Sequence, residues 1–197
     1  GYEWEKENIQ TFFDDLVAEI DKTYPQTTHY RGPFLGVMIL TEYQKTSPDG
    51  VANEPKTCEV VDGQQRTTSS FLLISIIRDY LDEIEGSLLK KITEDTPEDL
   101  KFAARNCKTN VSNWVTTLEQ FLYHDLLGTK TERLISWPAI TPIIRRTIYT
   151  PGSHIKEKGV ESADKKNKQT KKFAEAVTLL RSSVKTHLSA IRDASKT

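Results

Sequence analysis

The feature that most constrains this sequence is an apolar helical segment near the middle of the chain. Between residues 67 and 85, apolar side chains occur around almost the whole circumference of a helix. They are Phe71, Leu72, Leu73, Ile74, Ile76, Ile77, Tyr80, Leu81 and Ile84. A helix that is apolar on all sides has to be covered by other elements on several faces. At 197 residues the chain can supply that cover, so we expect a central core helix.

One helix and two strands are predicted ahead of this core helix. Residues 8–20 (NIQTFFDDLVAEI) have apolar and acidic side chains on opposite faces of a helix. The runs PFLGVMILTEY and TCEVVD are short and β-rich, and the loop between them contains Pro, Gly and Asn. The pattern predicts a hairpin with a long loop, and therefore an α+β fold class.

The second half of the chain is predicted to be mostly helical. Thr96 as the N-cap and Pro97 at the first helical position predict a helix start, and the apolar stripe that follows predicts a helix ending near Gly128. Residues 143–149 fit a strand or a short helix equally well. Residues 156–172 contain seven lysines against three acidic residues, which is typical of a solvated loop, and a final helix follows.

Composition narrows the classes of partner and compartment. The formal net charge of −1 excludes a global attraction to DNA or anionic membranes, so such binding needs a local patch. Cys58 and Cys107 lie far apart without metal-ligand spacing, which suits a reducing cytoplasm. No apolar run approaches the roughly 20 residues of a membrane span. We expect a cytoplasmic protein, and its start at Gly1 rather than Met suggests a fragment.

The chain changes from strand to helix just ahead of the core helix. The strand ends at Asp62, the chain turns at Gly63, and the helix begins near Arg66. Such a corner presents backbone N–H groups and the positive end of the helix dipole, which together bind phosphate. Gly63 lets a ligand approach the backbone, and Arg66 offers a fork for phosphate oxygens. We expect an anion site here; the alternative is a structural corner without a ligand.

The other polar residues of the corner suggest roles around a bound phosphate. The hydroxyls of Thr67 and Thr68 can donate to phosphate, and two glutamine amides can donate and accept. Asp62 repels phosphate, so we expect it to cap the helix, hold Arg66 or bind a phosphate-bridging Mg²⁺. The candidate catalytic residues are Asp62, Gln64, Gln65 and Arg66, and the candidate phosphate-binding residues are Gly63, Arg66, Thr67 and Thr68.

The corner also carries a family resemblance. Residues 62–66 (DGQQR), followed by two threonines, resemble the signature of the GmrSD-type N-terminal domain family of type IV, modification-dependent restriction proteins. Tyr2-x-Trp4 and the strand FLGVMIL are similar to two further family motifs, so the resemblance covers residues 1–90. It implies a ParB/sulfiredoxin-like small sheet with a buried helix after the DGQQR turn. It also implies NTP binding or hydrolysis coupled to DNA restriction.

The sequence departs from the family pattern in three places. The family's opening Gln-Arg would precede Gly1, and its later F-x-x-N-x-x-G motif does not follow the last helix. A leucine usually separates the arginine from the two threonines, whereas Thr67 directly follows Arg66 here. We expect a DGQQR domain over residues 1–90 and a helical extension over residues 91–197.

The predicted function is that of a nucleotide-binding, regulatory or DNA-sensing module in a bacterial restriction or phage-defence protein. Its ligand would be an NTP, with or without Mg²⁺, and DNA contact and a nuclease would belong to the full-length protein. HNH, P-loop and Rossmann motifs are not found. The alternatives are a phosphotransferase and a non-catalytic DNA-binding or protein-interaction module, in which Lys156–Lys172 would contact DNA.

Several other residues have an ordinary structural interpretation. We expect the three tryptophans, Trp4, Trp114 and Trp137, to pack in the core or between domains. Cys58 is expected to be buried beside the corner. Arg145 and Arg146 are either surface residues or phosphate contacts.

Overall fold

The computed structural model describes residues 2–23, 37–43, 57–88, 90, 92–126, 128–134, 141–155 and 168–194. This part of the chain contains five helices and two antiparallel hairpins. The helices are α1 (Lys6–Thr23), α2 (Gln64–Leu88), α3 (Glu98–Leu122), α4 (Thr141–Ile148) and α5 (Lys168–Ala194). The strands are β1 (Ile39–Tyr43), β2 (Thr57–Asp62), β3 (Tyr123–Leu126) and β4 (Thr129–Glu132). The predicted α+β class is confirmed.

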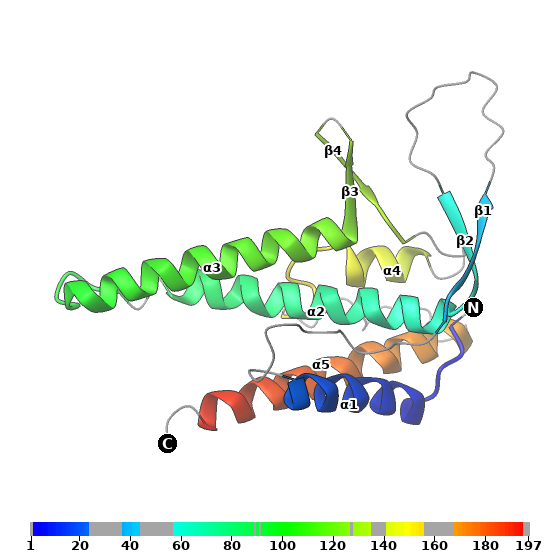
Figure 1. Ribbon diagram of the computed structural model, residues 1–197, viewed down its shortest axis with the longest axis horizontal. Coiled ribbons are helices and arrows are strands. Elements are labelled where there is room, and N and C mark those ends of the chain that lie inside the picture. The colour runs from blue at the N-terminus through cyan, green and yellow to red at the C-terminus, as the bar shows by residue number, and fades with distance from the viewer. Residues whose placement is uncertain are drawn as a thin grey trace.

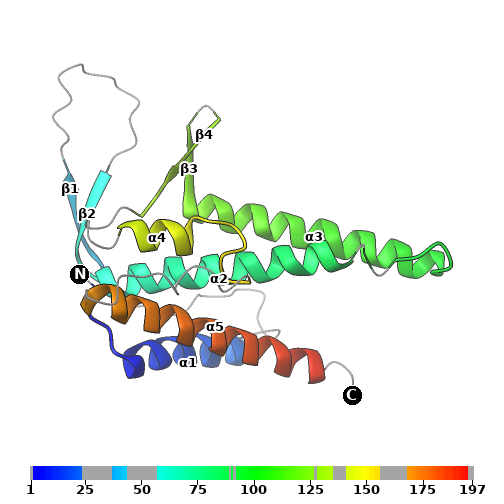
Figure 2. The same ribbon diagram turned by 180° about the vertical axis from the view of Figure 1, so that it is seen from behind.

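Helix α2 is the central element. It runs antiparallel beside α3, and α1 and α5 lie together on its other side (Figures 1 and 2). Its side chains Leu72 and Ile76 are completely buried. The predicted core helix is therefore confirmed, and its all-round apolar surface is used by α3, α4 and α5 together.

One continuous apolar core joins the two halves of the chain. Its buried members come from the N-terminal segment and all five helices; they include Tyr2, Ile9, Phe13, Leu72, Leu122, Ile144, Phe173 and Val184. Hairpin β1–β2 lies at the end of α2 from which that helix starts (Figure 1). A boundary near residue 90 stays a prediction.

A buried ion pair interrupts the apolar surface of α2. Arg78 is only 1% exposed, and its guanidinium donates to Asp79 Oδ1 at 2.7 and 3.0 Å. It also donates to the carbonyl of Ile148 at the end of α4. The second oxygen of Asp79 accepts the backbone N–H of His154 at 3.0 Å. The pair thus binds α2 to α4 and to the turn that follows it.

His154 continues this polar chain toward α5. Arg181 Nε donates to His154 Nδ1 at 2.9 Å, so the ring proton must sit on Nε2. Nε2 then donates to Ser75 Oγ, which in turn donates to the carbonyl of Leu72. Burial, with the Arg181 charge next, lowers the pKa of His154 to about 3. His154 is therefore neutral in the folded protein.

The neutral state of His154 predicts how stability depends on pH. The unfolded chain takes up a proton near pH 6.5, whereas the folded chain resists it down to about pH 3. His154 therefore contributes stability above pH 6.5, and this contribution falls by about 1.4 kcal/mol per pH unit below it. Urea unfolding between pH 4 and 7 should show a shallower pH dependence for His154→Gln than for the wild type. His124→Gln in β3 is the matched control, and equal slopes for all three proteins would contradict the assignment.

The structure corrects two predicted helix ends. Helix α3 ends at Leu122 rather than near Gly128, because Tyr123 adopts extended backbone angles and begins hairpin β3–β4. The Tyr123 hydroxyl donates to the carbonyl of Tyr149 at 2.7 Å, and this distant contact outweighs the helical pattern. The helix begins at Glu98 after Pro97, without a side-chain cap, so the predicted Thr96 cap is wrong. Residues 143–148, left open by the sequence, belong to α4.

The prediction that Cys58 is buried is also wrong, because Cys58 is exposed on β2. Trp114 is 57% exposed on α3, which excludes the core but not packing between domains. Trp4 is half-buried against Phe12, with ring centroids 5.6 Å apart. Trp137 and most of the lysine-rich segment lie outside the described residues. None of the described helices has the length and apolar character that crossing a membrane requires.

Candidate functional site

The site is built on the corner between β2 and α2. Strand β2 ends at Asp62, Gly63 has a φ of +89°, and α2 starts at the next residue. The chain of β1 passes close by: a Cβ added to Gly63 would lie 2.7 Å from Met38 Cγ. Both the backbone angle and the contact therefore require glycine.

Replacing this glycine tests the corner directly. Gly63→Ala should lower the free energy of unfolding by at least about 1–2 kcal/mol, because an L-residue is strained at positive φ and Met38 must move. Gly86→Ala is the matched control, since nothing lies within 4 Å of its added Cβ inside α2. That change should raise stability by up to about 1 kcal/mol. Chemical denaturation measures both, and equal effects would contradict the described corner.

The first residues of the signature are fixed by short-range contacts. Asp62 Oδ1 accepts the backbone N–H of Gly63 at 2.7 Å. Gln64 Nε2 donates to the carbonyl of Val60 at 2.7 Å, which ties the first turn of α2 to β2. Asp62 therefore supports the turn itself, and within the described part of the chain no ion pair joins it to Arg66.

The two threonines make helical contacts. Thr67 Oγ1 donates to the carbonyl of Gly63 at 3.0 Å and lies 3.1 Å from Met38 Sδ. Thr68 Oγ1 donates to the carbonyl of Gln64 at 2.8 Å. Each hydroxyl bonds the carbonyl four residues earlier, so either must turn away from its present partner before it can donate to a phosphate.

The N-terminal segment packs against the same corner. The Tyr2 hydroxyl lies 2.9 Å from Ser69 Oγ, and the backbone N–H of Glu3 donates to Gln65 Oε1 at 3.0 Å. Burial raises the pKa of Tyr2 to about 12. The Tyr2-x-Trp4 and DGQQR motifs, more than 60 residues apart in the chain, therefore form one structure.

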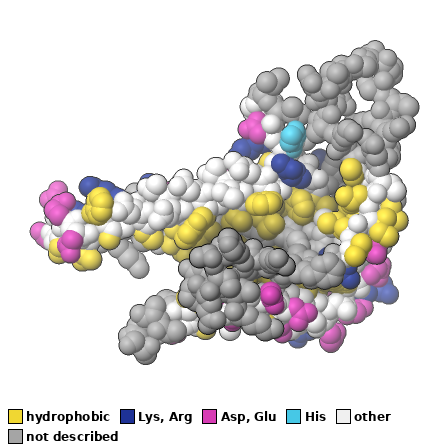
Figure 3. Space-filling view, in the orientation of Figure 1, with side chains coloured by type: hydrophobic (Ala, Val, Ile, Leu, Met, Phe, Trp, Pro, Cys, Tyr) yellow, Lys and Arg dark blue, Asp and Glu magenta, His cyan; other side chains and the backbone are white. Residues whose placement is uncertain are grey.

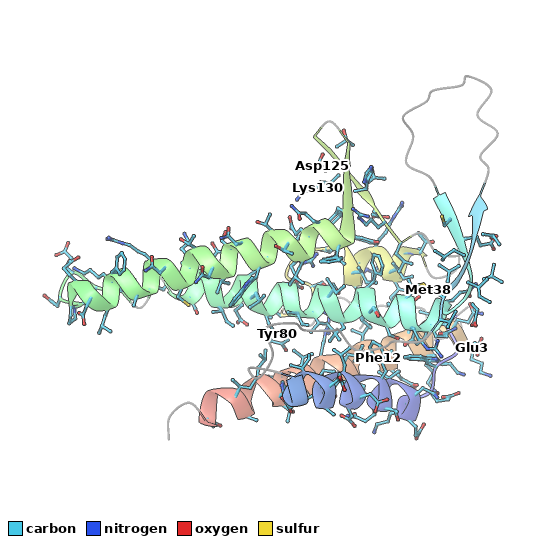
Figure 4. All side chains as sticks on the ribbon, viewed as in Figure 1. Glu3, Phe12, Met38, Tyr80, Asp125 and Lys130 are labelled. Atoms are coloured by element: carbon cyan, nitrogen blue, oxygen red, sulfur yellow. The ribbon has the colours of Figure 1, made fainter. Side chains whose placement is uncertain are left out.

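Lysine 172 fixes the start of α5 to this segment. Its Nζ contacts Glu5 Oε1 at 2.6 Å and Glu3 Oε2 at 3.3 Å, and it donates to the carbonyl of Glu3 at 3.0 Å. The hydrogen bond to Lys172 lowers the pKa of Glu5. Helices α1, α2 and α5 consequently begin at the same end of the molecule, where Glu3 and Met38 are seen in Figure 4. Three positive helix ends converge there.

The corner borders a cavity of about 260 Å³. Its lining consists of Trp4, Val61, Asp62, Gly63, Gln64, Gln65 and Arg66. Arg66 is exposed, and its Nη1 lies 3.5 Å from the carbonyl of Val37. All five residues of the DGQQR signature thus face one cavity, which can accept an anion at a helix start beside a guanidinium.

The structure separates some predicted residues from this cavity and adds others. Thr67 lines a neighbouring groove, and Thr68 lines neither. Trp4 packs against the core, as predicted, and it also lines the cavity, which was not predicted; its position in the Tyr2-x-Trp4 motif was the available signal. Within the described ranges, no three His, Cys, Asp or Glu side chains are grouped to hold a metal ion.

Fold and corner together define a mostly helical α+β domain with a DGQQR turn at the start of its central helix. A family model described as "GmrSD restriction endonuclease, N-terminal domain" matches residues 1–195. The chain belongs to this family, and the match extends through the helical half beyond residues 1–90. No curated protein and no solved structure matches the chain. Family membership connects the domain with a multi-domain restriction protein.

Proposed function

We propose that this domain binds a nucleoside triphosphate through its phosphates at the Gly63 turn. The observation that carries the proposal is the cavity that all five signature residues share with Trp4. Its volume of about 260 Å³ lies slightly below the range for small-ligand sites, about 300–1,000 Å³. That space suits the phosphate end of a nucleotide, with the rest extending toward solvent.

The charges around the cavity support an anionic ligand. The first turn of α2 directs backbone N–H groups and a positive dipole toward it. Arg66 can donate two parallel hydrogen bonds to phosphate oxygens, and its exposure leaves the side chain able to turn toward them. Asp62 is the only carboxylate among the described residues of the lining, and it already accepts the Gly63 N–H.

The proposal includes a place for Mg²⁺ and for hydrolysis. Mg²⁺ is usually held by one or two carboxylates together with substrate phosphates, and Asp62 suits that role. The bound ion would neutralise charge on the phosphates. The Glu3 N–H donates to Gln65 Oε1 and so supports an orienting role for this side chain. Its amide would direct a water molecule toward the terminal phosphate. Gln64, held by Val60, would keep the turn in shape.

The wider setting is also part of the proposal. We place the domain in the cytoplasm as the regulatory or DNA-sensing module of a modification-dependent, phage-defence protein. DNA contact and cleavage would belong to the full-length protein. The β1–β2–α2 unit would correspond to the ParB/sulfiredoxin-like arrangement that the DGQQR resemblance implies. The hairpin that precedes a buried helix supports this reading.

Arg66→Ala tests nucleotide binding. Loss of a charge-assisted contact worth about 1.5–3 kcal/mol should weaken NTP binding roughly ten- to a hundredfold in calorimetry with Mg²⁺. Arg105→Ala removes an exposed arginine from α3 and is the matched control. Thermal melting should show both variants folded. Equal affinities for the wild type and Arg66→Ala, or no NTP binding by the wild type, would refute the proposal.

Gln65→Ala distinguishes hydrolysis from binding alone. An amide that orients water acts mainly in the transition state, so phosphate release should fall about tenfold or more while affinity changes little. Gln120→Ala, an exposed glutamine of α3, is the control. If the wild type binds NTP without releasing phosphate, the domain is a nucleotide sensor rather than an NTPase.

A further inference from the structure

We propose that two copies of this chain associate antiparallel along α3, with the acidic end of each α3 seated in the apolar, arginine-flanked groove of the other. The proposal does not rest on the nucleotide-binding proposal. It rests on three surfaces of the α2–α3 pair. They are the tip, where residues 93–102 connect the two helices, the middle of α3, and the groove beside Phe121 near the two hairpins.

The tip of the α2–α3 pair is both acidic and apolar. From Thr93 to Leu100 the chain carries four carboxylates and no cation. Leu100 and Phe102 are 56% and 65% exposed there. Glu98 is paired with Lys101 at 2.9 Å, and the lysine side chain is largely covered. The exposed Lys90 lies in the same connection, so carboxylates outnumber cations at the tip without being alone there. Exposed apolar groups beside carboxylates favour a partner that is apolar and basic.

The opposite end of the pair has that complementary character. A groove of about 300 Å³ lies between β1, α2, and the end of α3. The described part of its lining is apolar except for two hydroxyls and two guanidiniums: Val37, Met38, Arg66, Thr67, Ser70, Phe71, Ile74, Phe121 and Arg133. Among these residues there is no carboxylate, and Phe121 is 58% exposed. The groove therefore suits an apolar side chain flanked by carboxylates.

The middle of α3 is uncharged. Residues 109–118 (TNVSNWVTTL) contain no charged side chain, and Trp114 is exposed among them. Leu100, Cys107, Trp114 and Phe121 follow one another at intervals of seven, so they share a face of the helix. All four are exposed. Figure 3 shows hydrophobic side chains at the tip, along the pair and at the hairpin end. Depletion of charge and enrichment in aromatics are typical of interface cores.

Antiparallel pairing places each tip against the groove of the other copy, and the middle of one α3 against the middle of the other. A two-fold axis near Asn110 places Leu100 opposite Phe121 of the second copy, and Cys107 opposite its Trp114. Residues 100 and 121 are separated by about 32 Å along a helix, so each tip reaches the other copy's groove. The contact is made twice and closes, as two-fold interfaces do.

The exposed area is sufficient for a dimer of moderate affinity. Trp114 and Phe121 are each about 60% exposed. At about 150–250 Å² per aromatic side chain, they can contribute roughly 450 Å² in a symmetric pair. Leu100 and the groove rim bring the total toward the ~1,000 Å² of a specific interface. A parallel pairing would instead place four carboxylates against the same four.

A charge-exchange experiment tests the proposal. The wild type should be dimeric in sedimentation at high micromolar concentration, and more weakly so in high salt. Asp95→Lys/Asp99→Lys reverses the tip and Arg133→Glu reverses the groove, so each variant alone should be mainly monomeric. Mixing the two should restore dimers, because each reversed tip then meets a reversed groove and each native tip a native groove. Ile191→Asp on α5, 54% exposed, is the control that should leave association unchanged.

Cross-linking tests the register. In a Cys58→Ser background, Asn110→Cys should form a disulfide-linked dimer on mild oxidation, whereas Cys107 alone should not, because the axis separates its two copies. Thermal melts establish that the variants are folded. A wild type that is monomeric at every concentration overturns the proposal; that result is expected if the groove binds DNA or another protein instead. Dimers that persist in either charge-reversal variant alone also overturn it.

Discussion

The structure depends on the buried ion pair between Arg78 and Asp79. Two charges in the middle of an apolar helix are costly unless every hydrogen-bonding group around them is matched. The matching groups come from the end of α4, the turn at His154 and, through that imidazole, from Arg181 of α5. No buried side-chain nitrogen or oxygen among the described residues lacks a partner. Helices α4 and α5 can therefore pack on α2 in one register only.

That register has consequences at the far end of α5. Because Arg181 is held beside His154, the first turn of α5 comes to lie where Lys172 meets Glu3 and Glu5. The N-terminal segment is thereby pressed onto the start of α2, where Tyr2 meets Ser69. The core network thus determines the position of Trp4 beside the DGQQR turn. A site that seems local in sequence depends on packing along the whole bundle.

The sequence predicted those parts of the fold that depend on residue spacing within a short stretch of the chain. The core helix, the β1–β2 hairpin and the turn at Gly63 each follow from spacing within about 20 residues. Hairpin β3–β4 was missed because Tyr123 leaves the helix to reach Tyr149. The buried network was missed because Arg78 and Asp79 are counted as surface residues by any hydropathy pattern. The exposure of Trp114 shows the reverse error, since an aromatic residue at helical spacing is read as core.

The candidate site was predicted in residue composition but not in arrangement. The five DGQQR residues were predicted as site residues, and all five line the cavity. The hydroxyls of Thr67 and Thr68 instead donate to backbone carbonyls of the Gly63–Gln64 turn, a local preference that would compete with donation to a ligand. Arg66 lines both the cavity and the groove, so its guanidinium is shared between the two proposed sites. One guanidinium cannot be fully engaged on both sides at once. An anion bound in the cavity would therefore compete with carboxylates in the groove for Arg66, and linkage would make that influence equal in both directions.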